Sequence, residues 1–324
     1  NGGAIGYLVG EENRGLEYMF IMMNAARYAV GVQGIAIAER AYQKAVQYAK
    51  DRVQSRPVDG SMNTSAPIIH HPDVKRMLMT MRASTEGCRA LATVAAAAYD
   101  AAHHHPDAEV RKQNALFYEF MVPLVKGYST EMSLEVTSLG VQVHGGMGFI
   151  EETGAAQFYR DARILPIYEG TTAIQANDLV GRKTYRDGGK VAKSIAALIK
   201  QTEAELANSG TPAAKVMLKH LAVARASFET VVDYVVVNFK TDIKGVFAGS
   251  VAYLRLAGLL MSGWQMARAL LAAEAKLDSD KEFFSAKVAT ARFHAEYLLS
   301  QVPGIAVSIL EGGATVNALS AEQF

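Results

Sequence analysis

Glu169 stands in a setting that suits a general base. It lies in the segment PIYEGTTAIQ, residues 166–175, between a tyrosine and a glycine and directly before a predicted helix. Thr171 or Thr172 is a suitable N-cap for that helix, so Glu169 falls on a short irregular connector that can aim one carboxylate. Two interpretations remain open: a charge that stabilises the positive helix end, or a base held in an apolar pocket beside Tyr168.

The glycines of HGGMGF, residues 144–149, are a second candidate for chemistry. A backbone without side chains lets a cofactor approach closely. Glycines after a long helix also mark a C-cap and a sharp turn, and spacing alone favours the turn. The segment is not a dinucleotide fingerprint, because no third glycine follows Gly148 at the required spacing and no strand precedes it.

The histidines do not form a metal-binding pattern. His103, His104 and His105 are adjacent, and neighbours on a helix diverge by roughly 100° each. They therefore cannot jointly coordinate one metal ion, as two histidines four residues apart on a helix can. His70 and His71 meet the same objection, so the sequence predicts no metal site.

Composition limits the classes of function. The chain has 324 residues, enough for two compact domains, with 33 basic and 32 acidic side chains. This balance argues against nucleic acid as a partner, because phosphate binding requires a basic excess. No run of about 18 apolar residues lacks a charge, so we expect no membrane insertion. The single cysteine, Cys88, suits a reducing compartment, either a bacterial cytoplasm or a mitochondrial matrix.

Hydrophobic periodicity predicts an all-α fold of two helical bundles joined near residue 188. In the first bundle, helices are predicted over 15–54, 72–103, 107–143 and 171–186, with a kink near Pro123, a loop over 55–67 and an irregular segment over 144–170. In the second, helices are predicted over 190–208, around 221–235, over 246–276 and over 281–300, before a break at Pro303 and Gly304.

Three segments resemble the acyl-CoA dehydrogenases: AVQYAKDRVQ (45–54), GVQVHGGMGFIEE (140–152) and FYRDARILPIYEGTTAIQ (158–175). The resemblance implies that residues 15–187 are the C-terminal helical bundle of the catalytic unit. Residues 1–14 would then be the end of a middle β-domain that the chain otherwise lacks. Residues 188–324 resemble the additional helical domain of a longer subgroup, so we expect a C-terminal fragment that is inactive on its own.

The resemblance also implies a reaction. It is the FAD-dependent α,β-dehydrogenation of an acyl-CoA thioester to a trans-2-enoyl-CoA, with electrons passing on to an electron-transferring flavoprotein. Glu169 matches the base that removes the α-proton. Its backbone N–H would be one of the donors to the thioester oxygen. The family further implies a homodimer or homotetramer.

Four positions match substrate contacts of the family. Tyr168 and Gly170 match residues that flank the acyl group, and Arg27, with Asn24 a turn earlier, matches the segment that contacts the CoA portion. As an alternative, Arg27 makes an ion pair on its helix face.

Five positions match contacts with FAD. Arg52 matches an arginine that binds the diphosphate across a subunit interface, a natural use of a guanidinium, although an ion pair on the helix face is again the alternative. Gln142, Gly145 and Gly146 match the stretch that holds the adenosine end. Thr171 matches a hydroxyl that contacts the cofactor near the helix start.

Two other functions remain open from the sequence. An acyl-CoA oxidase uses the same base and delivers electrons to oxygen. The helices after residue 190 could instead form a non-catalytic interaction module.

Overall fold

The computed structural model describes residues 2–324, apart from the side chain of Ile21, and within that range the chain is helical with no strand. An isolated antiparallel bridge joins Val53 to Pro67 across the base of the loop that was predicted over 55–67. The prediction of an all-α fold is therefore confirmed.

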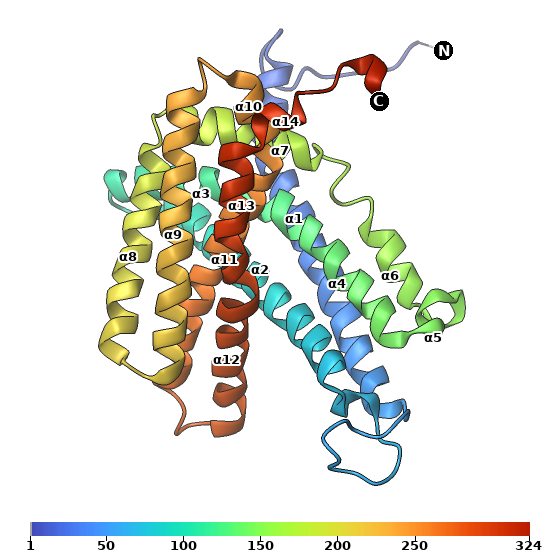
Figure 1. The fold of residues 1–324 in the computed structure, drawn as a ribbon. Helices are drawn as coiled ribbons and strands as arrows, with labels where there is room; N and C mark the ends of the chain where they lie inside the picture. Colours follow the sequence, from blue (N-terminus) through green and yellow to red (C-terminus); the bar gives the residue numbers. More distant parts are fainter. Residues whose placement is uncertain (1) are drawn as a thin grey trace.

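Four long helices form the first bundle (Figure 1). They are α1 (Gly15–Asp51), α2 (Pro72–His104), α3 (Ala108–Pro123) and α4 (Ser129–His144). Helix α4 packs along α1, and α2 packs against α1, α3 and α4. Three short helices follow: α5 (Gly146–Phe149), α6 (Ala155–Ala162) and α7 (Thr172–Asp178).

The kink predicted near Pro123 is a π-helical turn, Leu124–Tyr128, between α3 and α4. Proline has no N–H to give to the helical ladder, so the ladder is locally rearranged there. The segment predicted to be irregular over 144–170 contains α5 and α6, a difference from the sequence prediction. Helix α7 also stops early, because a second π-helix, Leu179–Tyr185, continues it.

Five longer helices form the second bundle: α8 (Lys190–Ser209), α9 (Pro212–Asn238), α11 (Ser250–Glu274), α12 (Lys281–Phe293) and α13 (Val302–Glu311). Two short ones accompany them, α10 (Ile243–Ala248) and α14 (Gly313–Val316). The predicted helix over 246–276 is interrupted at Gly249. The predicted break at Pro303 is wrong, because Pro303 lies in the first turn of α13, where its missing N–H leaves no helical bond unmade.

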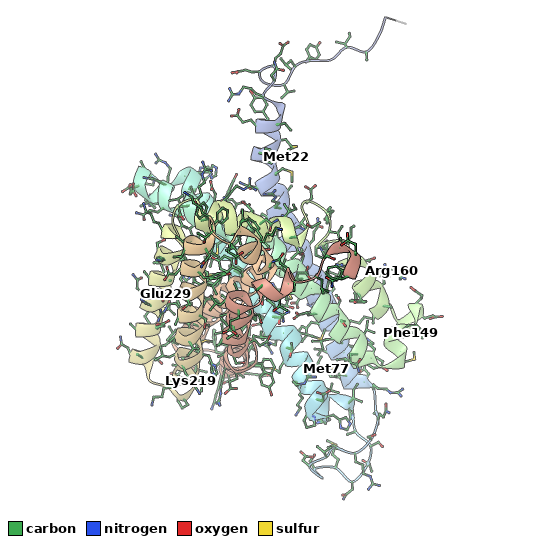
Figure 2. All side chains as sticks on the ribbon, turned by 45° about the horizontal axis from the view of Figure 1, so that its top comes forward. Met22, Met77, Phe149, Arg160, Lys219 and Glu229 are labelled. Atoms are coloured by element: carbon green, nitrogen blue, oxygen red, sulfur yellow. The ribbon has the colours of Figure 1, made fainter. Side chains whose placement is uncertain are left out.

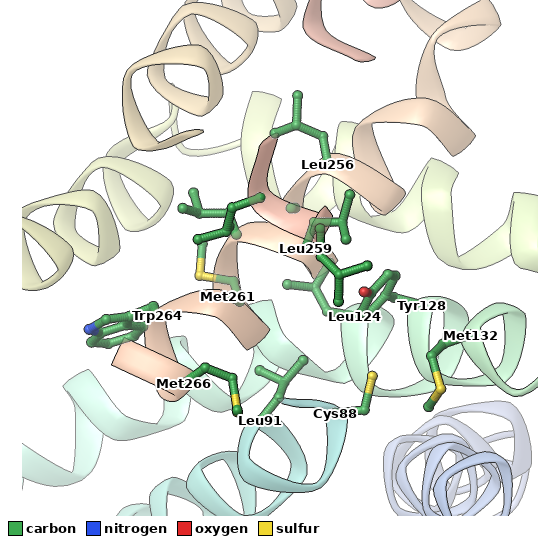
Figure 3. Packing of buried hydrophobic residues seen from close by; sticks show 14 of the residues in the cluster. Cys88, Leu91, Leu124, Tyr128, Met132, Leu256, Leu259, Met261, Trp264 and Met266 are labelled. Carbon is green, nitrogen blue, oxygen red and sulfur yellow. The ribbon is translucent and has the colours of Figure 1, made fainter. Parts of the chain in front are cut away.

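The two bundles share one hydrophobic core, which Figure 3 shows at their junction. Leu259 of the buried helix α11 lies beside Leu124 and Tyr128 of the π-turn, with Cys88 of α2 below them in this view. Position 188, predicted as the joint, lies in the turn before α8, but the packing of the core continues across it.

The first turns of α1 stand clear of the bundles, as the position of Met22 in Figure 2 shows. The side chains of Leu16 and Met22 are 71% and 59% exposed. By length and composition alone, α1 is also the one helix of the described residues that could cross a membrane. A core helix of a soluble protein passes the same test, and the second half of α1 packs in the bundle.

Candidate active site

Glu169 lies in a turn with two consecutive left-handed residues. The backbone φ is +55° at Glu169 and +86° at Gly170. A left-handed backbone at a residue other than glycine costs on the order of 1–3 kcal/mol, so neighbouring groups must hold it in place. The carboxylate side chain is half-buried between the end of α6 and the start of α7. This geometry sets the direction in which the Glu169 side chain leaves the backbone.

Contacts with α1 and α4, and one within the segment itself, hold this turn. The Tyr168 hydroxyl donates to Oε1 of Gln33 on α1. The Thr172 hydroxyl donates to Glu131 of α4, and its N–H donates to the Pro166 carbonyl at 3.0 Å.

The turn leads directly into α7. Thr171 is the N-cap, and its hydroxyl accepts from the N–H of Ile174 at 3.4 Å. A hydroxyl at this place satisfies one of the free N–H groups of the first turn, as the sequence predicted for one of the two threonines.

The carbonyl of Gly170 accepts two hydrogen bonds from buried side chains. One comes from Lys126 Nζ at 2.6 Å and the other from Gln175 Nε2 at 3.2 Å. Sequence analysis did not identify Lys126, which lies in the π-turn and is fully buried. The available signal was a lone charge in the apolar stretch FMVPLVKGY.

Arg27 is buried beneath α7 rather than presented to solvent. Its Nη1 lies 3.7 Å from Oδ2 of Asp178, and its Nε has no hydrogen-bond partner within the described part of the chain. Asp178 also accepts from Nε of Arg182 at 2.5 Å. Asn24 is half-buried one turn earlier on α1. Arg27 thus pairs across two helices and keeps an unused donor.

Four of the five predicted FAD contacts line one pocket of about 330 Å³: Arg52, Gln142, Gly145 and Gly146. The pocket lies where the ends of α1 and α4 meet. Tyr48 and His144 stack there with their ring centroids 4.3 Å apart. Burial lowers the pKa of His144, whose Nδ1 lies 2.7 Å from the Gly140 carbonyl.

The groups in this pocket suit a dinucleotide. Arg52 supplies a cation with paired donors for a diphosphate, and Gln142 supplies an amide for a base or ribose. At Gly145 and Gly146, the space where a side chain would stand is open to beyond 4 Å. A ligand can therefore approach the backbone closely at these glycines.

The predicted residues form two groups rather than one. Arg27, near Glu169, lies on α1, and Arg52, in the pocket, is the residue that directly follows this helix. At 1.5 Å per residue, the helix separates them by about 37 Å. Thr171 therefore lies with the Glu169 group, and one FAD molecule cannot contact both groups in one chain.

A larger cavity lies elsewhere. It has a volume of about 820 Å³ and lies between α2, α3, α8 and α11, where Phe117 and Trp264 line it. None of the residues predicted from the sequence lines this cavity. No cluster of three metal-ligating side chains occurs in residues 2–324.

Comparison with known families assigns both bundles to described domain families. The profile described as "Acyl-CoA dehydrogenase, C-terminal domain" matches residues 13–183, more than half of the chain, including both groups of predicted site residues. The chain belongs to the acyl-CoA dehydrogenase family. A second profile, "Acetyl-CoA dehydrogenase C-terminal like", matches residues 191–320.

Relatives within the family cover nearly the whole chain. The 3-methylmercaptopropionyl-CoA dehydrogenase of Ruegeria pomeroyi, a member of the longer subgroup, is 59% identical over 91% of this chain and 50% of its own length. A broad-specificity linear acyl-CoA dehydrogenase of Mycobacterium tuberculosis is 36% identical over 91% of this chain and 51% of its own. The chain therefore spans about half the length of the curated relatives it matches.

A solved structure has the same arrangement of helices. The acyl-CoA dehydrogenase of Bacillus anthracis, crystallised with FAD, aligns with a TM-score of 0.72 at 21% identity, over 94% of this chain and 51% of that one. At this identity, the likeness establishes the fold of both bundles and nothing finer.

Proposed function

We propose that the protein to which this chain belongs is an FAD-dependent acyl-CoA dehydrogenase, in which Glu169 removes the α-proton of an acyl-CoA thioester to begin formation of a trans-2-enoyl-CoA. The observation that carries the proposal is the fixed left-handed turn at Glu169, which lies inside the family match. When bound, FAD supplies the acceptor for the hydride that leaves the β-carbon.

The chemistry requires an oriented carboxylate, because the proton α to a thioester is only weakly acidic. A positioned base contributes typically 10²–10⁴-fold to such a step. The turn gives Glu169 that orientation. Its backbone N–H, next to the Tyr168 carbonyl, is the proposed donor to the thioester oxygen, since hydrogen bonds to the developing charge stabilise an enolate.

Substrate binding would use the residues around this turn. Tyr168 and Gly170 would flank the acyl group, and Asn24 and Arg27 would contact the CoA portion. The 59% identity to a 3-methylmercaptopropionyl-CoA dehydrogenase makes that thioester the first substrate to test.

Cofactor binding would use two subunits. Arg52, Gln142, Gly145 and Gly146 would hold the diphosphate and adenosine of one FAD, and Thr171 would contact another. The length of α1 between the two groups supports this division, because a single dinucleotide cannot reach both. We therefore propose a homodimer or homotetramer with FAD at the subunit interface.

We further propose an electron-transferring flavoprotein as the acceptor of the electrons. A reducing compartment, a bacterial cytoplasm or a mitochondrial matrix, would suit the lone buried thiol, since burial raises the pKa of Cys88 to about 12 and keeps it protonated and unreactive.

The test is anaerobic bleaching of the flavin in the complete protein by a panel of acyl-CoA thioesters. We expect rapid loss of flavin absorbance and an enoyl-CoA product. An absence of bleaching with every thioester would contradict the proposal. Stoichiometric peroxide in air, without transfer to an electron-transferring flavoprotein, would identify an oxidase instead.

A further inference from the structure

Lys126 is a buried cation whose hydrogen-bonding capacity is mostly unused. Its side chain is fully buried, and its hydrogen bond within residues 2–324 goes to the Gly170 carbonyl, at 2.6 Å. An ammonium has three N–H donors. A buried charge with two free donors is unfavourable for stability, so its position next to the Glu169 turn calls for an explanation.

The π-turn explains how a lysine reaches this place. Pro123 interrupts the helical ladder at the end of α3, and residues 124–128 form one wider turn. The extra residue in that turn changes the direction of the side chains that follow. The Lys126 side chain points toward the Gly170 carbonyl in the turn at Glu169. Leu124 and Tyr128, on the same π-turn, pack in the hydrophobic core. π-turns of this kind are frequent at functional sites.

Charged groups face Lys126 from each element packed around it. Burial lowers its pKa to about 8, and Arg27 of α1 adds to that effect. Glu131 of α4 and Glu169 of the turn act in the opposite direction. Asp178 of α7 pairs with Arg27 and so partly neutralises the second cation. At pH 7 the ammonium is therefore still charged, and two carboxylates attract it.

The bonded carbonyl belongs to the residue directly after the proposed base. Glu169 and Gly170 both have left-handed backbones, and this conformation persists only when its surroundings determine it. Gln175 donates to the same carbonyl from α7. The two donors fix the plane of the peptide that follows Gly170, and thereby the direction in which the neighbouring side chain leaves the turn.

We propose that Lys126 is a positioning residue for Glu169: its hydrogen bond to the Gly170 carbonyl holds the turn that aims the carboxylate. The inference rests on the proposed role of Glu169 as base. Lys126 itself contacts neither the substrate nor the reacting atoms.

The test separates proton removal from hydride transfer. An acyl-CoA with sulfur in place of its β-methylene presents acidic α C–H bonds but has no β C–H bond from which a hydride can leave. Its α-proton passes to Glu169, and a deuteron returns from D₂O, so mass spectrometry measures the base alone. Wild-type protein that bleaches with substrate establishes the proposed function independently of Lys126.

In the complete protein, Lys126→Met should lower the saturating rate of exchange about 10- to 100-fold, as expected for a misplaced catalytic group. The thioester concentration at half-saturation should stay within about threefold. Lys126→Arg should recover most of the rate, and Lys193→Met, which removes an exposed lysine paired with Asp233, should change nothing.

A Lys126→Met protein with a wild-type exchange rate would overturn the proposal. Gln175→Leu gives a second test that leaves the buried charge in place, should the lysine variants fail to fold. It removes the other donor to the Gly170 carbonyl, so exchange should slow about threefold. An unchanged rate in Gln175→Leu would equally overturn the positioning role of these hydrogen bonds.

Discussion

At the scale of single residues, His294 is a buried titratable group at the junction of the two bundles. Its Nε2 lies 3.3 Å from the Ser262 hydroxyl of α11, and its Nδ1 has no partner in the described part of the chain. A β-carbon on Gly87 of α2 would stand 3.2 Å from Nε2. Burial lowers the pKa of His294 from 6.5 to about 4.

This histidine makes stability depend on pH. The unfolded chain takes up a proton near pH 6.5, whereas the folded chain does so only near pH 4, so stability should fall as pH decreases through this window. The expected loss is about 3 kcal/mol at most. Urea unfolding at pH 6.5, 5.5 and 4.5 measures it.

In His294→Gln the loss between pH 6.5 and 4.5 should be smaller than in the wild type. The difference in unfolding free energy between the wild type and His294→Gln at each pH does not contain the effect of carboxylate protonation, because both proteins share the same carboxylates. His104→Gln, at an exposed histidine, is the matched control and should keep the wild-type slope. Equal slopes in all three proteins would show that His294 does not titrate in this way.

The sequence predicted the structural role of a single residue correctly where that role depends only on residues next to it in the chain. The N-cap Thr171 is such a case, since capping depends on adjacent residues. Lys126 and Asp178 were missed because their partners lie 44 and 151 residues away in the chain, at Gly170 and Arg27. Pairings over such distances depend on packing, which local sequence patterns do not record.

At the scale of elements, the crossing of α1 over the π-turn is the contact that places the site. A β-carbon on Gly31 of α1 would stand 2.3 Å from the Val125 carbonyl oxygen, next to Lys126. The nearby atoms belong to backbone, which cannot rotate away as a side chain can. The close approach therefore requires glycine at residue 31.

Gly31→Ala should destabilise the fold by about 2–3 kcal/mol, because α1 and the π-turn must separate to admit one methyl group. Gly304→Ala is the matched control in α13, where nothing lies within 4 Å of the added carbon. It should leave stability unchanged or raise it by up to about 1 kcal/mol. The denaturant midpoint measures both changes in stability, provided that the unfolding free energies of the variants depend on denaturant concentration with the same slope. Equal stabilities of the two variants would disprove the contact.

Helix positions were predictable because an apolar stripe repeats with the helical period. The existence of α2, α8 and α9 followed from that pattern and from proline or glycine at their ends. The π-turns were not predictable, since one extra residue in a turn leaves the stripe nearly unchanged. Pro303 was read as a break, although a proline in the first turn is compatible with a helix.

At the scale of the whole molecule, the two regions matched by different family profiles pack as one body. Helix α11 of the second region lies against α2 and the π-turn of the first (Figure 3). The second bundle therefore supports the turn that carries Lys126 from behind. Both bundles therefore contribute to the position of the turn at Glu169.

The pattern of exposure fits a chain whose site is completed by further protein. The two groups of proposed site residues lie far apart on α1, and the first turns of that helix expose apolar side chains (Figure 2). The relatives are about twice as long as this chain. The decisive measurement therefore belongs to the complete protein with its flavin.

That measurement is the rate of flavin bleaching by acyl-CoA when Glu169 is changed to Gln. The amide keeps the size of the side chain but cannot take a proton. The variant should retain its flavin and bind the thioester, and bleaching should slow by at least about 1000-fold. Bleaching at the wild-type rate would contradict the assignment of Glu169 as the base.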